Sequence, residues 1–505
     1  MSQRRSSFDQ APNAATGATP QKRRQLWKAL LFRLAAVLLG LSPLIVTEVV
    51  LRALDLGRPT DFDDPFVGFS AVHPLFVLNP ETGRREIPKS RQSHFRPESF
   101  NATKAPNEFR IFVLGGSTVQ GRPWSIETSF TTWLELALAA ADPSQKWEVV
   151  NCGGISYASY RLAPILEEVL RYEPDLVIFY EGNNEFLEDR TYEDIKHAPA
   201  ALALPHRQVA RLRTYSLLRG AVLRLSGGGS EASPAGRPVL ADETDAMLDW
   251  RGGIAQYHRD ADWQRDVTTH FETTLRRMVA MAESAKVPLL FVSPVTNLEW
   301  PPFKSEHRAG LSPAELERFD SLRTQASETI ARDLPAALAL FRQAAEIDGE
   351  FALVHYEIGT CLKELGQFEE ARAAWLKARE LDVCPLRMTA PLGEKLRLVA
   401  TATGTPLLDA DALLAARSRS GFADNQWLVD HVHPSIAGHQ ILATALVEQL
   451  AGMKVARPVA DWEAAREVAF EQHLTSLDAA YFERGRTFLQ AEQNWARGKA
   501  TKERP

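Results

Sequence analysis

The chain has 505 residues, of which 24% are charged and 45% hydrophobic, values typical of a folded protein with more than one core. The total charge is −6 and residues 1–33 contribute +6 (seven Lys or Arg against Asp9), so the rest of the chain carries −12. An acidic body argues against nucleic acid as a partner, because phosphate binding needs a basic face. The three cysteines are scattered and fit neither a disulfide framework nor a zinc site.

The N-terminal segment is basic and then apolar. Residues 1–28, rich in Ser, Gln, Pro and Ala, are predicted to be a disordered cytoplasmic tail. The stretch "LAAVLLGLSPLIVTEVVL" follows at Leu34–Leu51, and we expect an uncleaved transmembrane anchor at residues 29–52. Because the Lys and Arg residues precede it, the positive-inside rule predicts a single-pass protein of the inner membrane, with its main body in the bacterial periplasm.

Beyond a predicted irregular linker at 53–105, strand-like and helix-like segments alternate. The predicted strands are "FRIFVLGG" (109–116), "KWEVVNCGG" (146–154), "PDLVIFYEG" (174–182), "VPLLFVSP" (287–294) and "TPLLDA" (405–410). The predicted helices include Thr128–Ala141, Arg161–Tyr172 and Asp266–Ala285. Alternation of this kind indicates an α/β fold with a parallel sheet that is covered on both faces.

A repeat interrupts the alternation before the fifth strand. Apolar and small residues recur 34 residues apart: Ala337, Phe341 and Ala344, then Ala371, Trp375 and Ala378. This period is typical of tetratricopeptide (TPR) helical hairpins, and Gly359 falls where two helices would pack closely. We therefore expect a TPR-like insertion at 331–387 between two parts of one domain, at 106–330 and 388–452. A helical C-terminal extension is expected at 453–505.

The first strand ends in Gly115-Gly116-Ser117-Thr118, and this turn is the best candidate for chemistry. A P-loop needs Lys followed by Ser or Thr where Arg122-Pro123 stands, and the glycine spacing does not fit a dinucleotide-binding turn. The remaining interpretation is a serine nucleophile, which needs a base and a carboxylate that orients the base.

The segment "WLVDHVHPSIAGHQ" supplies both groups, because Asp430 can reach the imidazole of His433 three residues later. His431 is expected to point away from Asp430, and His439 is expected at the surface of a helix. Donors for an oxyanion come from the side-chain amide of Asn184 in "FYEGNNEF" and from a backbone N–H in "NCGGISYAS".

These blocks, in this order, resemble the SGNH hydrolases of the GDSL-like lipase and esterase group. Gly116 stands where the family has aspartate, Glu185 replaces the aspartate after the asparagine block, and the family's oxyanion glycine falls at Ser156. The resemblance implies a flavodoxin-like three-layer α/β/α sandwich without metal or cofactor. It also implies site roles for particular residues. The catalytic residues are Ser117, Asp430 and His433, and the oxyanion donors are Ser117, Asn184 and either Ser156 or Gly154.

Two further residues are candidates for substrate contact. Asn297 follows the fourth strand, where it would line the substrate entrance or order the loop; Arg387 would pair an anionic substrate group or the helical insertion. The function expected is a serine esterase acting on an acyl ester of a cell-envelope glycan, lipid or small molecule. Two alternatives are an O-acyltransferase to an envelope polysaccharide and a non-enzymatic scaffold that binds a protein partner through the insertion.

Overall fold

The computed structural model describes residues 32, 40, 42–53, 64, 66–69, 73–191, 213–214, 239–240, 243 and 246–496. The chain divides into two compact units, Met1–Thr60 with Leu204–Ser230, and Asp61–Ala203 with Glu231–Pro505. In the first unit, residues 42–53 are helical, and the carboxylate of Glu48 accepts hydrogen bonds from Thr214. Within the described residues, no helix has the length and apolar character needed to cross a membrane. The tail at 1–28 lies outside the described residues, as do residues 29–31, 33–39 and 41 of the predicted anchor at 29–52.

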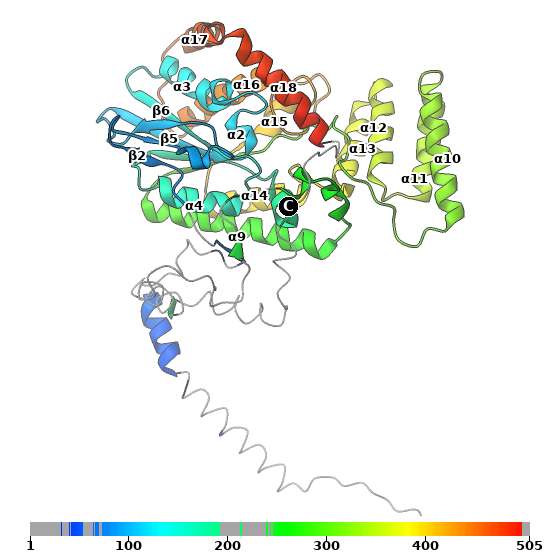
Figure 1. Cartoon of the computed structure of the whole chain (residues 1–505), viewed down its shortest axis with the longest axis horizontal. Coiled ribbons are helices and arrows are strands. Elements are labelled where there is room, and N and C mark those ends of the chain that lie inside the picture. The colour runs from blue at the N-terminus through cyan, green and yellow to red at the C-terminus, as the bar shows by residue number, and fades with distance from the viewer. Residues whose placement is uncertain are drawn as a thin grey trace, which may run out of the picture. The chain divides into compact units, whose positions relative to one another are not determined.

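A parallel sheet forms the centre of the second unit (Figure 1). Its strands are β5 (Glu108–Gly115), β6 (Lys146–Gly153), β7 (Leu176–Tyr180), β9 (Leu289–Ser293) and β10 (Leu407–Asp409), in the order β10-β9-β7-β5-β6. Every neighbouring pair is parallel. All five predicted strands are therefore confirmed, together with the parallel sheet.

Helices cover both faces of this sheet (Figure 1). The side chains of Phe112 and Leu114 enter the core beneath α4 (Ser159–Val169), α9 (Ala261–Ala285) and α14 (Ala390–Thr403). Ile111 and Val113 point to the opposite core, beneath α3 (Phe130–Ala141), α16 (Ile436–Gly452) and α17 (Trp462–Ser476). Alternate residues of one strand thus enter two cores, which is why the strand reads as a continuous apolar run.

The segment predicted to be irregular, 53–105, contains regular structure instead. β2 (Val77–Asn79), β3 (Arg84–Glu86) and β4 (Ser99–Asn101) form an antiparallel sheet, and β1 (Gly68–Phe69) pairs with β8 (Val239–Leu240). Phe76 and Phe100 are fully buried from this segment, and Phe100 packs edge-on against Phe112 of the central sheet. Strands of two or three residues are too short to show a period in the sequence, so the prediction failed here.

The insertion consists of four helices, α10 (Pro313–Thr329), α11 (Leu334–Ile347), α12 (Ala352–Glu364) and α13 (Phe368–Leu381). They share one apolar cluster, which also takes in Leu298 and Phe422 of the neighbouring loops. The expected close contact at Gly359 is confirmed, because a Cβ there would lie 2.5 Å from the indole of Trp375. α10 packs with this cluster as well, although the sequence placed the start of the insertion only at residue 331.

The remaining elements are short or lie at the ends of the sheet. They are α2 (Ser117–Gln120), α5 (Glu185–Thr191), α15 (Ala410–Ala415), α18 (Ala479–Ala496), η1 (Lys89–Arg91), η2 (Ile126–Thr128), η3 (Met247–Asp249) and η4 (Gly253–Gln256). The C-terminal extension is helical, as predicted.

Candidate active site

Ser117 begins α2 directly after β5, on a turn that two glycines make possible. A Cβ at Gly115 would clash with the carbonyl oxygen of Tyr180 on the adjacent strand β7. A Cβ at Gly116 would clash with the carboxylate of Glu181 and would lie 2.5 Å from Nδ2 of Asn184. The turn therefore presses against the end of β7, and it brings the asparagine block beside the serine.

Ser117, His433 and Asp430 form a continuous chain of hydrogen bonds. Nε2 of His433 lies 2.7 Å from Oγ of Ser117, and Nδ1 of His433 lies 2.6 Å from Oδ2 of Asp430. The second oxygen of Asp430 accepts the backbone N–H groups of Val432, at 2.9 Å, and of His433, at 2.8 Å. These hydrogen bonds suit the activation of a serine, because one imidazole nitrogen faces the serine hydroxyl and the other nitrogen is held by a carboxylate.

The electrostatics of this pair favour a charged Asp430 and a basic His433. Burial alone would raise the pKa of Asp430, but the neighbouring His433 and the accepted hydrogen bonds outweigh it and hold that pKa well below its usual range. Burial alone would lower the pKa of His433, but the charge and hydrogen bond of Asp430 outweigh it, so this pKa is raised. The imidazole is thus a stronger base than an ordinary buried histidine.

The other two histidines of this segment are buried and neutral. His439 is completely buried, and its Nδ1 accepts the backbone N–H of Phe130 at 3.1 Å, which corrects the expectation of a surface position. It lies on the face of α16 that packs against Phe130 of α3, and the sequence of α16 shows no strong amphipathic pattern that would reveal this face. His431 lines the cavity described below, with Nδ1 3.5 Å from Oδ1 of Asp430. Burial lowers the pKa of both imidazoles to about 3.

The groups predicted to be oxyanion donors lie beside Ser117 on two loops. The carboxylate of Glu181 accepts the backbone N–H groups of Gly182, Asn183 and Asn184 at 2.9 to 3.0 Å, which fixes the loop after β7. The amide of Asn184 donates to the carbonyl of Tyr157 at 3.3 Å and reaches the Gly116 turn. Burial raises the pKa of Glu181 to about 7, although its hydrogen bonds oppose this.

The second loop follows β6 and distinguishes between the two predicted donors. The N–H of Gly154 donates to the carbonyl of Gly115 at 2.9 Å, so this group is occupied and the expectation for Gly154 is corrected. Ser156 has a left-handed backbone, with φ of 62°, and it lines the cavity. The N–H groups of Ser156 and Ser117 meet no acceptor among the residues that the structure describes.

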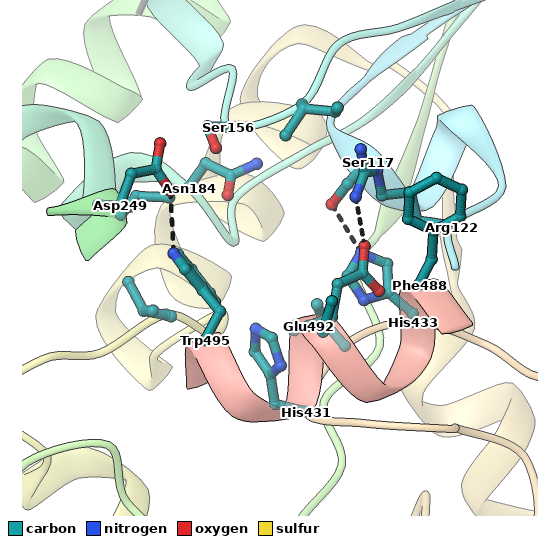
Figure 2. A pocket seen from close by; sticks show the side chains of 15 residues that line it. Ser117, Arg122, Ser156, Asn184, Asp249, His431, His433, Phe488, Glu492 and Trp495 are labelled. Atoms are coloured by element: carbon teal, nitrogen blue, oxygen red, sulfur yellow. Dashed lines mark hydrogen bonds and ion pairs between the residues drawn. The ribbon is translucent and has the colours of Figure 1, made fainter. Parts of the chain in front are cut away.

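A cavity of about 240 Å³ opens at Ser117 (Figure 2). Its lining residues are Ser117, Arg122, Ile155, Ser156, Asn184, Leu187, Asp249, Leu386, His431, Val432, His433, Phe488, Ala491, Glu492 and Trp495. The last four belong to α18, which the sequence predicted only as a helix of unknown role. Their spacing places them on one helical face, but nothing in the sequence connects that face with a serine more than 350 residues earlier.

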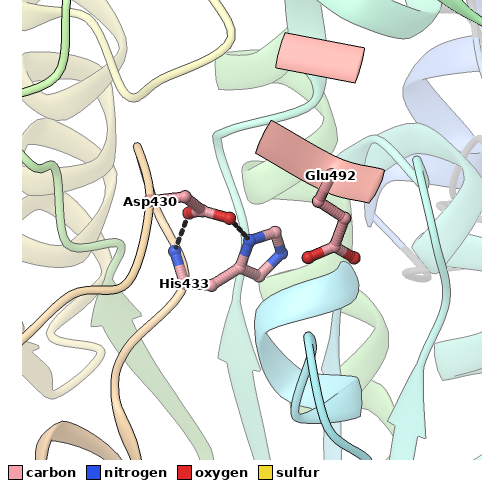
Figure 3. Close-up of side chains that lie close together, drawn as sticks. All are labelled: Asp430, His433 and Glu492. Carbon is pink, nitrogen blue, oxygen red and sulfur yellow. Dashed lines mark hydrogen bonds and ion pairs between the residues drawn. The ribbon is translucent and has the colours of Figure 1, made fainter. Parts of the chain in front are cut away.

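Glu492 reaches toward Asp430 and His433 from α18 (Figure 3). Its Oε1 pairs with Arg122 at 2.7 Å, and its Oε2 is buried without a hydrogen-bond partner. Among the described residues, ligand atoms of Asp430, His433 and Glu492 lie within 4.8 Å of one another, close enough for a metal ion. However, both nitrogens of His433 are already engaged, with Asp430 and with Ser117, so the geometry fits proton transfer better than metal binding.

Asn297 and Arg387 stabilise loops instead of lining the cavity, which corrects the expectation of substrate contact. Nδ2 of Asn297 donates to the carbonyl of Asp430 at 2.8 Å, so this residue supports the loop that carries Asp430 and His433. The buried guanidinium of Arg387 donates to the carbonyls of Asn297 and Trp300. It lies 3.6 Å from Asp382 at the end of the insertion, in line with the structural alternative.

Comparison with known proteins gives similarity only at the level of solved structures. No family model matches the chain, and no curated protein matches it. An alpha/beta hydrolase enzyme from the metagenome of Lake Arreo, Spain, is similar at 15% identity and a TM-score of 0.31, over 69% of this chain and 97% of that one. A lipase/acylhydrolase from Enterococcus faecalis is similar at 12% identity and a TM-score of 0.30, over 70% of this chain and 98% of that one. A catalytic mutant of an acetylxylan esterase from Geobacillus stearothermophilus is similar at 15% identity and a TM-score of 0.29, over 69% of this chain and 96% of that one. All three are hydrolases.

Proposed function

We propose that this chain is a serine esterase with Ser117 as nucleophile, His433 as general base and acid, and Asp430 as the group that orients the imidazole. The observation that carries this proposal is the unbroken hydrogen-bond chain from Ser117 through His433 to Asp430 at the wall of a cavity. A serine hydroxyl needs this arrangement to lose its proton as it attacks.

Acylation starts when Oγ of Ser117 forms a bond to the ester carbonyl carbon and its proton passes to Nε2 of His433. The carbonyl oxygen becomes an oxyanion, which the N–H groups of Ser117 and Ser156 and the amide of Asn184 are placed to receive. One such donor typically contributes ~3 kcal/mol to the transition state. The intermediate then breaks its bond to the alcohol oxygen, and the alcohol leaves with the proton from Nε2.

Deacylation repeats these steps with water. Water attacks the acyl carbon, gives its proton to Nε2, and the carboxylic acid leaves as Ser117 regains the proton. An O-acyltransferase would share the first half and would place a sugar hydroxyl where water enters. Whether water or a sugar hydroxyl attacks the acyl-enzyme depends on the part of the cavity that the alcohol leaves. Analysis of the products distinguishes hydrolysis, which gives a free acid, from transfer, which gives a new ester.

Hydrolysis of p-nitrophenyl acetate by the purified chain tests this proposal. We expect steady turnover that Ser117→Ala reduces to the background rate, since no other group replaces the nucleophile. Ser327→Ala, on the exposed face of α10 in the insertion, is the matched control and should leave turnover unchanged. Turnover that survives in Ser117→Ala would refute the assignment.

A further inference from the structure

His431 places a second imidazole in the cavity beside Ser117. It stands two residues before His433 on the same loop, and the centres of the two rings lie 5.9 Å apart with their planes nearly perpendicular. Figure 2 shows the ring of His431 pointing into the cavity. The reaction steps proposed above use only the imidazole of His433. A second imidazole is therefore available to contact a molecule that binds next to Ser117.

The loop after β9 holds the ring of His431 in one orientation. Phe303 packs edge-on against this ring at 4.9 Å between ring centres, and Trp300 lies at 6.2 Å. The backbone carbonyl of His431 accepts the N–H of Asn297 at 3.0 Å, and the side chain of Asn297 also supports Asp430. An imidazole fixed in this way can bind a small molecule with little further loss of side-chain entropy.

The charge of Asp430 decides which nitrogen of His431 carries the proton. Burial lowers the pKa of His431 to about 3, so near pH 7 the ring is neutral and has one N–H and one lone pair. Nδ1 is enclosed without a hydrogen-bond partner and lies 3.5 Å from Oδ1 of Asp430. A lone pair on Nδ1 would be repelled by this carboxylate, whereas an N–H dipole is attracted to it, so the proton belongs on Nδ1. Nε2, at the end of the ring that points into the cavity, is then a hydrogen-bond acceptor.

Two imidazole acceptors thus face the space beside Ser117 once this serine is acylated. The acylated serine has no proton to donate, so Nε2 of His433 can accept one from the next nucleophile. Two hydrogen bonds of about 2.8 Å span up to roughly 5.6 Å, which is comparable with the 5.9 Å between the centres of the two rings. A water molecule has two O–H groups and can donate one to each ring, whereas an alcohol has only one. The arrangement therefore suits water better than an alcohol.

We propose that Nε2 of His431 binds the water molecule that deacylates Ser117 and so favours hydrolysis over transfer to an alcohol. This inference rests on the proposed esterase and assigns one more residue to the second half of its reaction. The water oxygen forms its bond to the acyl carbon while one of its protons passes to Nε2 of His433. The other O–H stays hydrogen-bonded to Nε2 of His431 and leaves with the carboxylic acid. The bond from the acyl carbon to Oγ of Ser117 breaks as Oγ takes the proton back from His433.

Rapid mixing of the purified chain with p-nitrophenyl acetate separates the two halves of the reaction, because p-nitrophenolate is released in the acylation step. In His431→Phe, which keeps a ring but has no acceptor, we expect the acylation rate to stay within about twofold. The deacylation rate should fall by about tenfold to a hundredfold, because the water is no longer oriented. An acetyl group should then accumulate on Ser117, which mass spectrometry of the acid-quenched protein detects.

Three more variants separate the lost acceptor from a change in packing. His431→Leu has no acceptor and no ring, and it should behave like His431→Phe. In His431→Gln the amide oxygen can replace the lone pair of Nε2, so this variant should keep most of the deacylation rate. His258→Phe, an exposed site outside the cavity, is the matched control and should change neither step.

Methanol as a competing acceptor gives a second readout that does not depend on absolute rates. Its single O–H donates to His433, so the loss of the acceptor at His431 should slow hydrolysis more than methanolysis. In His431→Phe the initial ratio of methyl acetate to acetic acid should therefore rise by about tenfold, and in His258→Phe it should stay unchanged. An equal ratio in His431→Phe and the unmodified chain would overturn the inference.

Two outcomes separate this inference from the proposed function. If the variants of His431 lower acylation and deacylation equally, His431 only supports its loop, and the inference is refuted while the esterase stands. If the unmodified chain releases no p-nitrophenolate in a way that depends on Ser117, the esterase itself is refuted and the role of His431 falls with it.

Discussion

Gly116 shows how one missing side chain shapes the site. The family that this sequence resembles has aspartate at this position, whereas here Glu181 and the amide of Asn184 occupy the space that a Cβ would need. The asparagine block therefore approaches Ser117 more closely than a larger residue would permit.

Gly116→Ala is expected to displace Asn184 and to cost roughly 1–3 kcal/mol of folding free energy, as overpacking does. Because an oxyanion donor moves, kcat should fall by about 10²-fold. Urea unfolding and ester hydrolysis measure the two effects. Gly452→Ala, where nothing lies within 4 Å, is the control. A fully active Gly116→Ala variant would contradict the placement of Asn184.

The raised pKa of His433 predicts the pH dependence of the reaction. His433 must be neutral to accept a proton, so kcat/KM should rise with pH through a midpoint above the ordinary histidine value of about 6.5. In Asp430→Asn the burial of His433 remains without its counter-charge, so the midpoint should move to lower pH while the rate falls by roughly 10³–10⁴-fold. The pH profiles of both proteins check this, with exposed His258→Gln as control. Identical midpoints would show that Asp430 does not set this pKa.

At the scale of residues, the sequence was informative where chemistry dictates spacing. The Gly-Gly-Ser turn and the three-residue step from Asp430 to His433 pointed to groups that the structure brings together. The sequence was uninformative where the role of a residue depends on the direction in which its backbone N–H points. Only the fold shows that the N–H of Gly154 is hydrogen-bonded, whereas the N–H of Ser156 meets no acceptor in the described part of the chain.

At the scale of elements, the long strands of the central sheet could be predicted because both their faces are buried and their sequences are continuously apolar. The short strands β2 to β4 could not be predicted. α18 could be predicted to be a helix. Its position at the wall of the cavity could not be predicted, because it depends on contacts between residues far apart in the chain. Gly485 against Trp124 is one of these contacts, since a Cβ at Gly485 would lie 1.9 Å from the indole.

Gly485→Leu is therefore expected to lift α18 from the body. Limited trypsin digestion should then cleave after Arg484 or Arg486 much faster than in the unmodified chain, because a docked helix resists proteolysis. Ester hydrolysis should fall in parallel as the cavity loses a wall. Thr487→Leu, on the exposed side of the same turn, serves as the matched substitution. Equal digestion rates for the two variants would argue against docking through Gly485.

In the whole molecule, helices α10 to α13 belong to one segment whose two ends meet. The N–H of Val383 donates to the carbonyl of Lys304 at 3.1 Å, and the carboxylate of Asp382 accepts the N–H groups of Phe303 and Lys304. The 34-residue period predicted helices in this segment, although α10 has no counterpart in the repeat; the TPR-like insertion itself stays a prediction from the sequence. The membrane anchor at 29–52 and a partner for the insertion stay predictions from the sequence.

Replacement of residues 308–380 by a short Gly-Ser linker should leave the sheet and the catalytic residues in place. The exposure of Leu298 and Phe422 should lower stability by about 1.5–3 kcal/mol for each side chain. A lower Tm with retained hydrolysis of p-nitrophenyl acetate is the expected result. A chain that fails to fold would show that the insertion belongs to the core.

A serine nucleophile activated by His433 should react covalently with an electrophile that mimics an ester, and such labelling tests the proposed role of Ser117 without any assumption about the substrate. A fluorophosphonate should add one label to the intact chain, and peptide mass spectrometry should place that label on Ser117. Labelling should be lost in Ser117→Ala and strongly slowed in His433→Ala, because the hydroxyl alone is a weak nucleophile. A folded chain that takes no label, or takes it on another residue, would show that Ser117 is not an activated nucleophile.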